Sequence, residues 1–251
     1  MRYSWGMRLL FLNSWDARQR DELVEFIQDQ TETVDVFCFQ EAEKNMQQVC
    51  RELLGDYQEF RAHKYISDKD EMTQTTYVRR GIEVSESGEI LQGQKDVGLG
   101  LYVQLASEAG PLYVCNFHGM SRPVDKLDNP GRIEASRKLI EYFKHKPLSI
   151  IGGDFNMLPD TEAIRMFSEE GFQDLIEEYG IPTTRNHLIW DLYPDTKQYY
   201  ADYVFLSPGL QVREFLVPDN TVSDHLPQIV DVDLRASHSI SGSLSREASR
   251  T

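Results

Sequence analysis

The chain has 251 residues, with 26 Lys and Arg against 41 Asp and Glu, so its formal net charge at pH 7 is −15. This length allows one large domain with its own core, which needs no disulfide framework or metal cluster to fold. An acidic chain of this kind is not held to DNA, RNA or anionic lipid by bulk electrostatics. A bound cation and a local basic patch can nevertheless hold a phosphate.

Cysteine content and hydropathy indicate the cellular context. The three cysteines, Cys38, Cys50 and Cys115, are too few and too scattered for a zinc cluster or a disulfide scaffold. Cys38 and Cys115 lie inside apolar runs, so we expect buried, reduced thiols. Every apolar run is shorter than the ~18 residues that a membrane span requires. We therefore expect a cytoplasmic protein without a membrane anchor.

Short apolar runs predict buried strands along most of the chain. The predicted strands cover 9–12, 34–39, 57–65, 75–78, 82–91, 99–105, 112–117, 148–151, 202–206, 210–217 and 228–234. The residues Leu99, Leu101, Val103 and Leu105 alternate with others, as in a half-buried antiparallel strand.

Helical spacing separates several of these runs. Asp16 and Gln19 resemble a capping box before a helix that contains Leu23 and Ile27. Further predicted helices cover about 46–54, 133–143, 160–168 and 171–179. Two mixed halves of this kind favour an α/β fold of two packed sheets flanked by helices. We expect one domain over 1–235 and a disordered polar tail over 236–251.

The polar residues of interest each lie at or beside the end of a predicted strand. They are Asn13, Gln40, Glu41, His118, Asp154, Asn156, Asp202, Asp224 and His225. Buried strands hold their terminal side chains in fixed positions, and ligand sites collect there. Taken alone, each residue also has a purely structural interpretation, as a turn former, as part of the first turn of a helix or as a structural histidine. Polar residues of this kind at six strand ends of one chain favour a functional cluster.

The residue types predict phosphate-ester hydrolysis. Carboxylates such as Glu41 are hard oxygen ligands of the kind that Mg²⁺ prefers. Histidine and asparagine donate hydrogen bonds to oxygens on which negative charge develops, and Asp154 can orient or deprotonate a water molecule. The sequence contains no GxSxG nucleophile elbow and no GxxxxGK[ST] loop, so water is the expected nucleophile.

Six motifs resemble those of the endonuclease/exonuclease/phosphatase superfamily, which is also called deoxyribonuclease I-like. They are N-S-W at 13–15, F-Q-E at 39–41, N-F-H at 116–118, G-G-D-F-N at 152–156, A-D-Y-V-F at 201–205 and S-D-H-L-P at 223–227. The motifs occur in the order of the family. The resemblance implies a four-layer α/β sandwich and a phosphodiesterase or phosphatase that uses Mg²⁺, with Mn²⁺ as a substitute.

The resemblance also implies roles for the individual residues. Glu41 would be the principal metal ligand, with Asn13 in support and Asp224 close to the metal. Asp154 would position the attacking water, and Asn156 would hold this water and the phosphate.

The resemblance assigns the two histidines to the phosphate. His118 and His225 would stabilise the phosphoryl oxygens. Asp202 would hydrogen-bond His225 and keep it protonated, because a neighbouring carboxylate raises the pKa of a histidine.

Three positions differ from particular branches of the family. Trp15 stands where some members have an acidic second-metal ligand. His118 stands where apurinic endonucleases have a tyrosine, and Met157 follows G-D-F-N where inositol polyphosphate phosphatases have Tyr-Arg. These departures disfavour a second metal at Trp15 and both of those activities.

Substrate choice is weakly encoded. In the segment 181–200, Arg185 is positioned to hold a phosphate and Trp190 to stack on a planar group. The alternative is a loop whose Trp190 packs on the core. We expect a phosphate-ester substrate, such as a short oligonucleotide or a nucleic-acid end, and a monomeric enzyme. Two alternatives stay open: a lipid-headgroup phosphodiesterase like the neutral sphingomyelinases, and a catalytically silent binding module.

Overall fold

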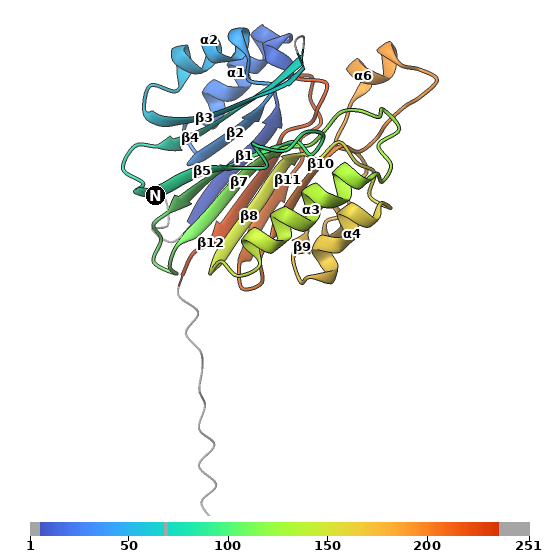
Figure 1. The fold of residues 1–251 in the computed structure, drawn as a ribbon. Helices are drawn as coiled ribbons and strands as arrows, with labels where there is room; N and C mark the ends of the chain where they lie inside the picture. The colour runs from blue at the N-terminus through green and yellow to red at the C-terminus, as the bar shows by residue number, and fades with distance from the viewer. Residues whose placement is uncertain (1–5, 68–69, 236–251) are drawn as a thin grey trace, which may run out of the picture.

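Two mixed β-sheets pack face to face in the computed structural model, which describes residues 6–67 and 70–235 (Figure 1). The first sheet contains, in spatial order, β11 (Gln211–Leu216), β12 (Gln228–Asp233), β1 (Gly6–Asn13), β2 (Val36–Gln40), β4 (Asp70–Arg79) and β3 (Tyr57–Ser67). The second contains β5 (Val84–Ile90), β6 (Leu99–Leu105), β7 (Leu112–His118), β8 (Leu148–Asp154), β10 (Asp202–Leu206) and β9 (Gln173–Asp174). The predicted tail over 236–251 lies outside the described residues.

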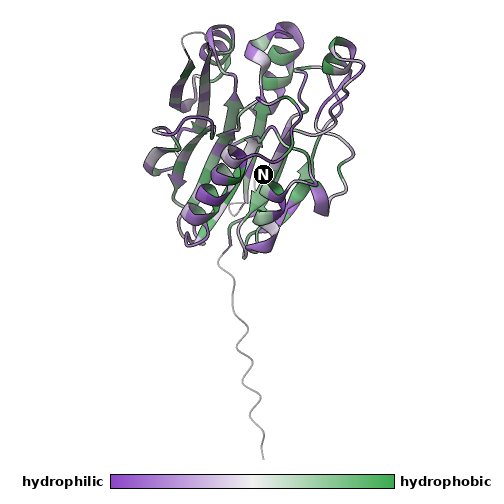
Figure 2. Ribbon diagram, turned by 45° about the vertical axis from the view of Figure 1, so that its right-hand side comes forward, coloured by the Kyte–Doolittle hydropathy of each residue, from purple (hydrophilic) through white to green (hydrophobic). Residues whose placement is uncertain are grey.

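Most of the helices cover the outer faces of the two sheets, whereas the last of them projects beyond the sheets (Figure 1). The helices are η1 (Trp15–Ala17), α1 (Arg20–Gln30), α2 (Lys44–Leu53), α3 (Pro130–Phe143), α4 (Glu162–Glu169), α5 (Leu175–Glu178) and α6 (His187–Leu192). From α1 and α2, Ile27 and Met46 join Phe37 of β2 in one core cluster. Leu139 of α3 and Phe167 of α4 belong to the larger cluster that also fills the space between the sheets. Figure 2 shows hydrophobic strands between helices whose outer sides are hydrophilic. The predicted four-layer α/β sandwich is confirmed.

Each sheet has a parallel pair of strands at its centre, β1–β2 in one and β7–β8 in the other. The register pairs Asn13 with Gln40 and His118 with Asp154. Because parallel neighbours end at the same edge of a sheet, both pairs lie at the carboxyl ends of the central strands, where α/β folds bind ligands. The fold thus gathers the predicted strand-end residues at one end of the sandwich.

The two glycines before Asp154 have separate structural reasons. A Cβ atom on Gly152 would lie 2.8 Å from the ring of Phe11, so a larger residue would push β8 away from β1 of the opposite sheet. Gly153 has a φ of +131°, a conformation that side-chain-bearing residues rarely adopt. Together they allow β8 to deliver Asp154 close to the first sheet.

The predicted capping box at Asp16 and Gln19 is wrong. Gln19 precedes α1 without a side-chain capping bond. Asp16 instead accepts hydrogen bonds from the backbone N–H groups of Asn45 and Met46, both at 3.0 Å, and so satisfies the first turn of α2. The carboxylate does cap a helix, but a helix that begins 28 residues further along the chain.

Other boundaries also differ from the predictions. The helix expected over 171–179 is a two-residue strand, β9, followed by the short helix α5. The strand expected over 75–78 begins five residues earlier as β4, and α6 was not predicted. Cys38 and Cys115 are buried and free, as expected, and Cys50 is buried and free as well. In the described part of the chain, no helix is long and apolar enough to cross a membrane.

Candidate active site

One carboxylate oxygen lies at the centre of the predicted cluster. Asp154 Oδ2 accepts a hydrogen bond from Asn13 Nδ2 at 2.9 Å, and the same amide nitrogen donates to Glu41 Oε1 at 3.1 Å. The Nε2 atoms of His118 and His225 each lie 3.8 Å from Asp154 Oδ2. Residues from five segments of the chain therefore converge on one position between the two sheets.

Asp154 is buried and surrounded by positive charge. Burial alone would raise the pKa of its carboxyl, but His225, Lys126, His118 and Arg185 together lower that pKa below its usual value. Such a group stays ionised at neutral pH and can accept a proton or orient a water molecule.

Asn156 is fixed directly beside this carboxylate. Its backbone N–H donates to Asp154 Oδ1 at 2.9 Å, and its Nδ2 donates to the carbonyl of Gly119 at 3.1 Å. It adopts a left-handed conformation with a φ of +58°, which asparagine tolerates better than most residues. The G-D-F-N motif is therefore a tight turn that holds two polar side chains at the end of β8.

His225 forms a pair with Asp202. Its Nδ1 lies 2.9 Å from each carboxylate oxygen of Asp202, and its Nε2 faces Asp154. Burial and Arg185 lower the pKa of His225, but the carboxylates of Asp202, Asp224 and Asp154 outweigh them and raise it. Burial in turn raises the pKa of Asp202. The arrangement favours a protonated imidazole whose free N–H points into the site.

His118 is not the satisfied structural histidine that its position alone would permit. Its side chain is buried, and within the described residues its Nδ1 has no hydrogen-bond partner. Its Nε2 faces the Asp154 carboxylate at 3.8 Å, too far for a hydrogen bond. Buried polar groups are nearly always paired, so an orphaned imidazole at this position indicates a ligand.

Glu41 is suited to hold a hard cation. It follows β2 with a φ of +48°, and Ser14 Oγ donates to its backbone oxygen at 3.0 Å. Asn13 Nδ2 donates to Oε1 of the Glu41 carboxylate, while Asn13 Oδ1 accepts from the N–H of Trp15 at 3.1 Å. The asparagine thus orients the carboxylate, and this half-buried group, together with Asp154, offers the oxygen donors that Mg²⁺ takes.

A second group of residues has metal-ligand spacing. One ligand atom each of Asp154, Asp202 and His225 lies within 4.8 Å of the others. In this trio, however, Asp202 is already hydrogen-bonded to His225, and the raised pKa of His225 favours a proton on the imidazole. A protonated imidazole repels a cation, so we favour Glu41 as the metal-binding residue.

Arg185 and Asp224 are held to each other. Arg185 Nη2 lies 2.5 Å from Asp224 Oδ2, and its Nε donates to the Asp224 carbonyl at 3.2 Å. Both side chains are buried, and a backbone bridge places Arg185 beside His225. The guanidinium therefore offsets the charge of Asp224 at the edge of the site.

Trp190 lies on α6, away from the main core. Its indole N–H donates to the carbonyl of Gln198 at 2.9 Å, and its ring lies 5.0 Å from that of Tyr199. The side chain is partly exposed, and α6 has no buried residue. The aromatic pair belongs to a segment that projects beyond the sheets (Figure 1).

Two buried amides beneath the site had no assigned role in the sequence analysis. Gln40 Nε2 donates to Asn116 Oδ1 at 2.6 Å, and Asn116 Nδ2 donates to the carbonyls of Phe39 and Thr75, both at 3.1 Å. These bonds link the two sheets directly below Glu41 and His118. Both residues stand inside the quoted motifs F-Q-E and N-F-H, which was the available signal.

Lys126 was also missed. Its side chain is buried, and its Nζ donates to Asn156 Oδ1. The sequence offered little indication, because Lys126 lies in a polar segment between two aspartates, Asp125 and Asp128.

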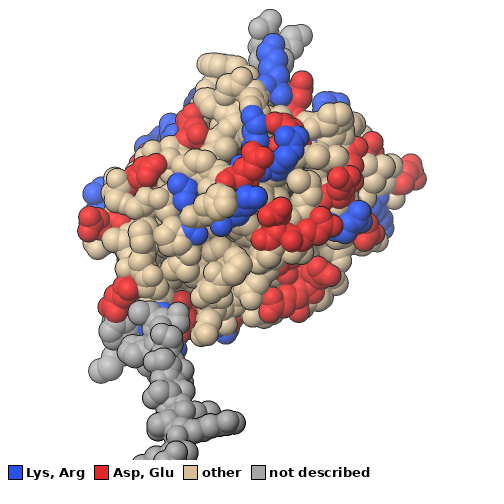
Figure 3. Space-filling model, turned by 60° about the horizontal axis from the view of Figure 1, so that its bottom comes forward, with Lys and Arg blue, Asp and Glu red and all other residues tan. Residues whose placement is uncertain are grey.

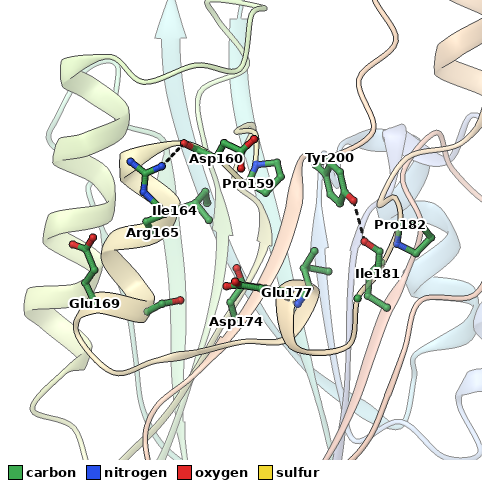
Figure 4. A pocket seen from close by; sticks show the side chains of 13 residues that line it. Pro159, Asp160, Ile164, Arg165, Glu169, Asp174, Glu177, Ile181, Pro182 and Tyr200 are labelled. Carbon is green, nitrogen blue, oxygen red and sulfur yellow. Dashed lines mark hydrogen bonds between the residues drawn. The ribbon is translucent and has the colours of Figure 1, made fainter.

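A groove on another part of the molecule is separate from this cluster. It encloses about 580 Å³ beside α4 and α5, and Figure 4 shows its lining. The carboxylates of Asp160, Glu169, Asp174 and Glu177 line it, against one arginine, Arg165. This acidic groove shares no residue with the cluster around Asp154 and is unsuited to a phosphate.

Comparisons with known proteins agree with this geometry. The model of the endonuclease/exonuclease/phosphatase family matches residues 9–225. A Bacteroides vulgatus endonuclease/exonuclease/phosphatase structure superposes with a TM-score of 0.73 at 17% identity, covering 92% of this chain and 99% of that one. The human Nocturnin catalytic domain with bound sulfate superposes with a TM-score of 0.67 at 18% identity, covering 91% of this chain and 93% of that one. D. rerio TDP2 complexed with a single-strand DNA product superposes with a TM-score of 0.67 at 16% identity, covering 91% of this chain and 99% of that one. A search of curated proteins finds no match.

Proposed function

Because the chain belongs to the endonuclease/exonuclease/phosphatase family, we propose that it is a Mg²⁺-dependent hydrolase of phosphate esters, a phosphodiesterase of the nuclease kind. The observation that carries the proposal is the convergence of Asn13, His118 and His225 on one oxygen of Asp154. An ionised carboxylate between two imidazoles combines a group that activates water with groups that donate to a phosphate.

The metal would be held by Glu41, which Asn13 orients, with Asp224 nearby. Mg²⁺ is the cation we propose, with Mn²⁺ as a substitute, because the donors are oxygens. When bound, the ion supplies positive charge that offsets the charge of the phosphate oxygens.

The remaining residues act on water and phosphate. Asp154 orients the attacking water and accepts its proton, and Asn156 holds the water and the phosphate in line. As the water oxygen bonds to phosphorus, the P–O bond to the leaving group breaks, and the protonated His225 can supply the proton that the leaving oxygen takes up. His118 and His225 donate hydrogen bonds to the phosphoryl oxygens as negative charge develops there. Asp202 keeps His225 protonated and fixes the orientation of its ring.

Several features support a substrate with a planar group, such as a short oligonucleotide or a nucleic-acid end. The partly exposed Trp190–Tyr199 pair, on the segment that follows Arg185, offers a stacking surface, and Arg185 adds a guanidinium at the edge of the site. TDP2, a structural neighbour, is complexed with a single-strand DNA product. The formal net charge of −15 also argues against a long basic track for a duplex. Figure 3 shows the end of the sandwich opposite the carboxyl ends of β1 and β8, where acidic and basic side chains of the described residues are interspersed.

A lipid-headgroup phosphodiesterase is the second candidate. Exposed apolar side chains occur on both segments that flank the site: Val124 and Leu127 after β7, and Leu192 and Tyr193 at the end of α6. Gln198 donates to the carbonyl of Val124 and joins these segments. Exposed apolar groups of this kind are typical of surfaces that meet an apolar partner. A silent binding module is disfavoured because all six motifs keep their polar residues.

A substrate screen tests the proposal. Purified protein is incubated with bis(p-nitrophenyl) phosphate, single-stranded oligonucleotides or sphingomyelin, with Mg²⁺ or with EDTA. We expect hydrolysis of a phosphodiester that EDTA abolishes. Preferential cleavage of sphingomyelin favours the second candidate, and full turnover in EDTA overturns the metal dependence.

The Glu41→Gln variant identifies the metal-binding residue. Glutamine preserves the size of the side chain and can still pair with Asn13, but it lacks the ligand charge. We expect activity to fall by about 10²-fold or more and Mn²⁺ affinity, measured by titration, to fall with it. Glu43→Gln, in the same connection before α2, is the matched control. Equal Mn²⁺ affinity in Glu41→Gln and the wild type contradicts this assignment.

A further inference from the structure

Lys126 is a buried cation that reaches the candidate site from outside the family motifs. It lies between β7 and α3 with a φ of +60°, and its side chain is only 5% exposed. Its Nζ donates to Asn156 Oδ1, and its carbonyl accepts from the N–H of Leu158 at 3.0 Å. The lysine is thus fastened to the turn that follows Asp154.

The partners of Lys126 are few for a buried ammonium. An ammonium group has three N–H donors, and within the described residues Lys126 Nζ pairs with one amide oxygen and with no carboxylate. Lys64, the other buried lysine described, donates to the backbone carbonyls of Leu91, Gln94 and Gly98. Lys64 therefore has the full set of protein partners that a structural lysine requires, and Lys126 does not.

The segment that carries Lys126 is held in place by Arg132 of α3. Arg132 of α3 is 2% exposed and donates to the carbonyls of Pro123 and Leu127, both at 2.5 Å, and to that of Met120 at 3.4 Å. A buried guanidinium with three backbone acceptors fixes the loop on both sides of Lys126. The ammonium is therefore held in place before any substrate arrives.

The charge of Lys126 acts on the catalytic carboxylate. It is among the positive groups that lower the pKa of Asp154. Burial lowers the pKa of Lys126 itself to about 8, so the ammonium is still mostly protonated at pH 7. A buried ammonium next to Asn156 that has few hydrogen-bond acceptors is suited to bind an anion.

We propose that Lys126 is a phosphate-binding residue of this site, whose ammonium donates to a non-bridging oxygen of the scissile phosphate while it holds Asn156 in position. This inference rests on the proposed function. It adds to the two histidines a third donor on the Asn156 side of the phosphate, from a residue that none of the six motifs contains.

Phosphate binding tests the proposal without turnover. Inorganic phosphate is titrated in the presence of Mg²⁺, and the rise in melting temperature is recorded. We expect phosphate to stabilise the wild-type protein, and its apparent affinity to fall by about 10-fold or more in Lys126→Met and in Lys126→Gln. Glutamine can still donate to Asn156, so Lys126→Gln remains informative if the methionine variant folds poorly. Lys138→Met, which removes the same charge from an ion pair with Glu134 on α3, is the control and should bind like the wild type.

Kinetics separate contact with phosphate from a structural effect. We expect kcat/KM to fall by about 10²-fold in Lys126→Gln and to recover partly in Lys126→Arg, since arginine also donates to phosphate. The proposal is overturned if phosphate does not stabilise the wild type, or if Lys126→Gln binds phosphate and turns over substrate as the wild type does. If no ester is hydrolysed but phosphate binding depends on Lys126, the proposed reaction fails and the binding role stands.

Discussion

His225 Nδ1 lies 2.9 Å from both carboxylate oxygens of Asp202, while the Nε2 of the same ring faces Asp154 at 3.8 Å. The imidazole therefore connects the buried carboxylate of Asp202 with that of Asp154, which borders the candidate phosphate position. A carboxylate behind a histidine fixes its ring and its protonation, which is the logic of many hydrolytic sites.

The Asp202→Asn variant tests whether the charge of Asp202 keeps His225 protonated. Asparagine keeps the size but loses the charge that raises the pKa of His225, so that pKa should fall. We expect kcat to drop by about 10²-fold and its alkaline limb to move to lower pH, since His225 is protonated only below its pKa. NMR titration of the His225 ring checks the shift, and an unchanged pKa would contradict the pairing.

The two histidines should act as one unit. His118 and His225 share Asp154 Oδ2 as a neighbour, so both can reach one phosphate. We expect His118→Ala and His225→Ala each to reduce kcat by about 10²-fold, and the double variant to lose much less than the product of the two. The exposed His145→Ala is the control and should be neutral. Strictly multiplicative losses would mean independent roles.

The sequence predicted the central strands and the strand-end residues because both depend on local patterns. Apolar runs such as the one ending at Phe39 are buried on both faces, and the motifs mark where those runs stop. Parallel pairing within each sheet brings Asn13 beside Gln40 and His118 beside Asp154. The packing of the two sheets then joins Asn13 to Asp154.

Features that depend on distant partners were not predictable. Lys126 is recognised only by its burial and by Asn156, 30 residues away. Helix α6 buries no residue, so no apolar periodicity marks it, and Asn186 alone signals its start. The polar beginning of β4 is paired with β3 in a hairpin, where pairing and not burial defines the strand.

Asp16 shows the same limitation and gives a stability prediction. Its carboxylate caps α2 through Asn45 and Met46, and its φ is +46°. Asp16→Ala loses the cap and puts a less tolerant residue in a left-handed conformation, so we expect a loss of about 1–2 kcal/mol in the free energy of unfolding.

Chemical denaturation measures this loss. Asp16→Asn keeps an acceptor and tolerates the backbone, so it should retain most of the stability. Asp29→Ala, an exposed substitution in α1, is the control for removal of one acidic charge. If Asp16→Ala and Asp29→Ala are equally stable, the capping assignment is wrong.

The buried carboxyl of Asp174 should make the stability of the protein depend on pH. Burial raises the pKa of this carboxyl to about 6, although the N–H groups of Glu177 and Ile176 favour its ionised form. An acid whose folded pKa is raised binds its proton more tightly in the native state. Its contribution to stability is therefore present below the unfolded pKa of about 4 and is lost as the pH rises through about 6.

Asp174→Asn should remove this dependence. The side chain lines the acidic groove, and an asparagine oxygen can still cap the first turn of α5 (Figure 4). We expect the free energy of unfolding of the variant to rise relative to that of the wild type between about pH 4 and pH 6, by at most about 3 kcal/mol for two pKa units. Urea unfolding at pH 4, 5, 6 and 7 checks this, with the exposed Asp160→Asn as the control from the same groove. A difference in stability that does not change with pH would show that Asp174 does not titrate in this range.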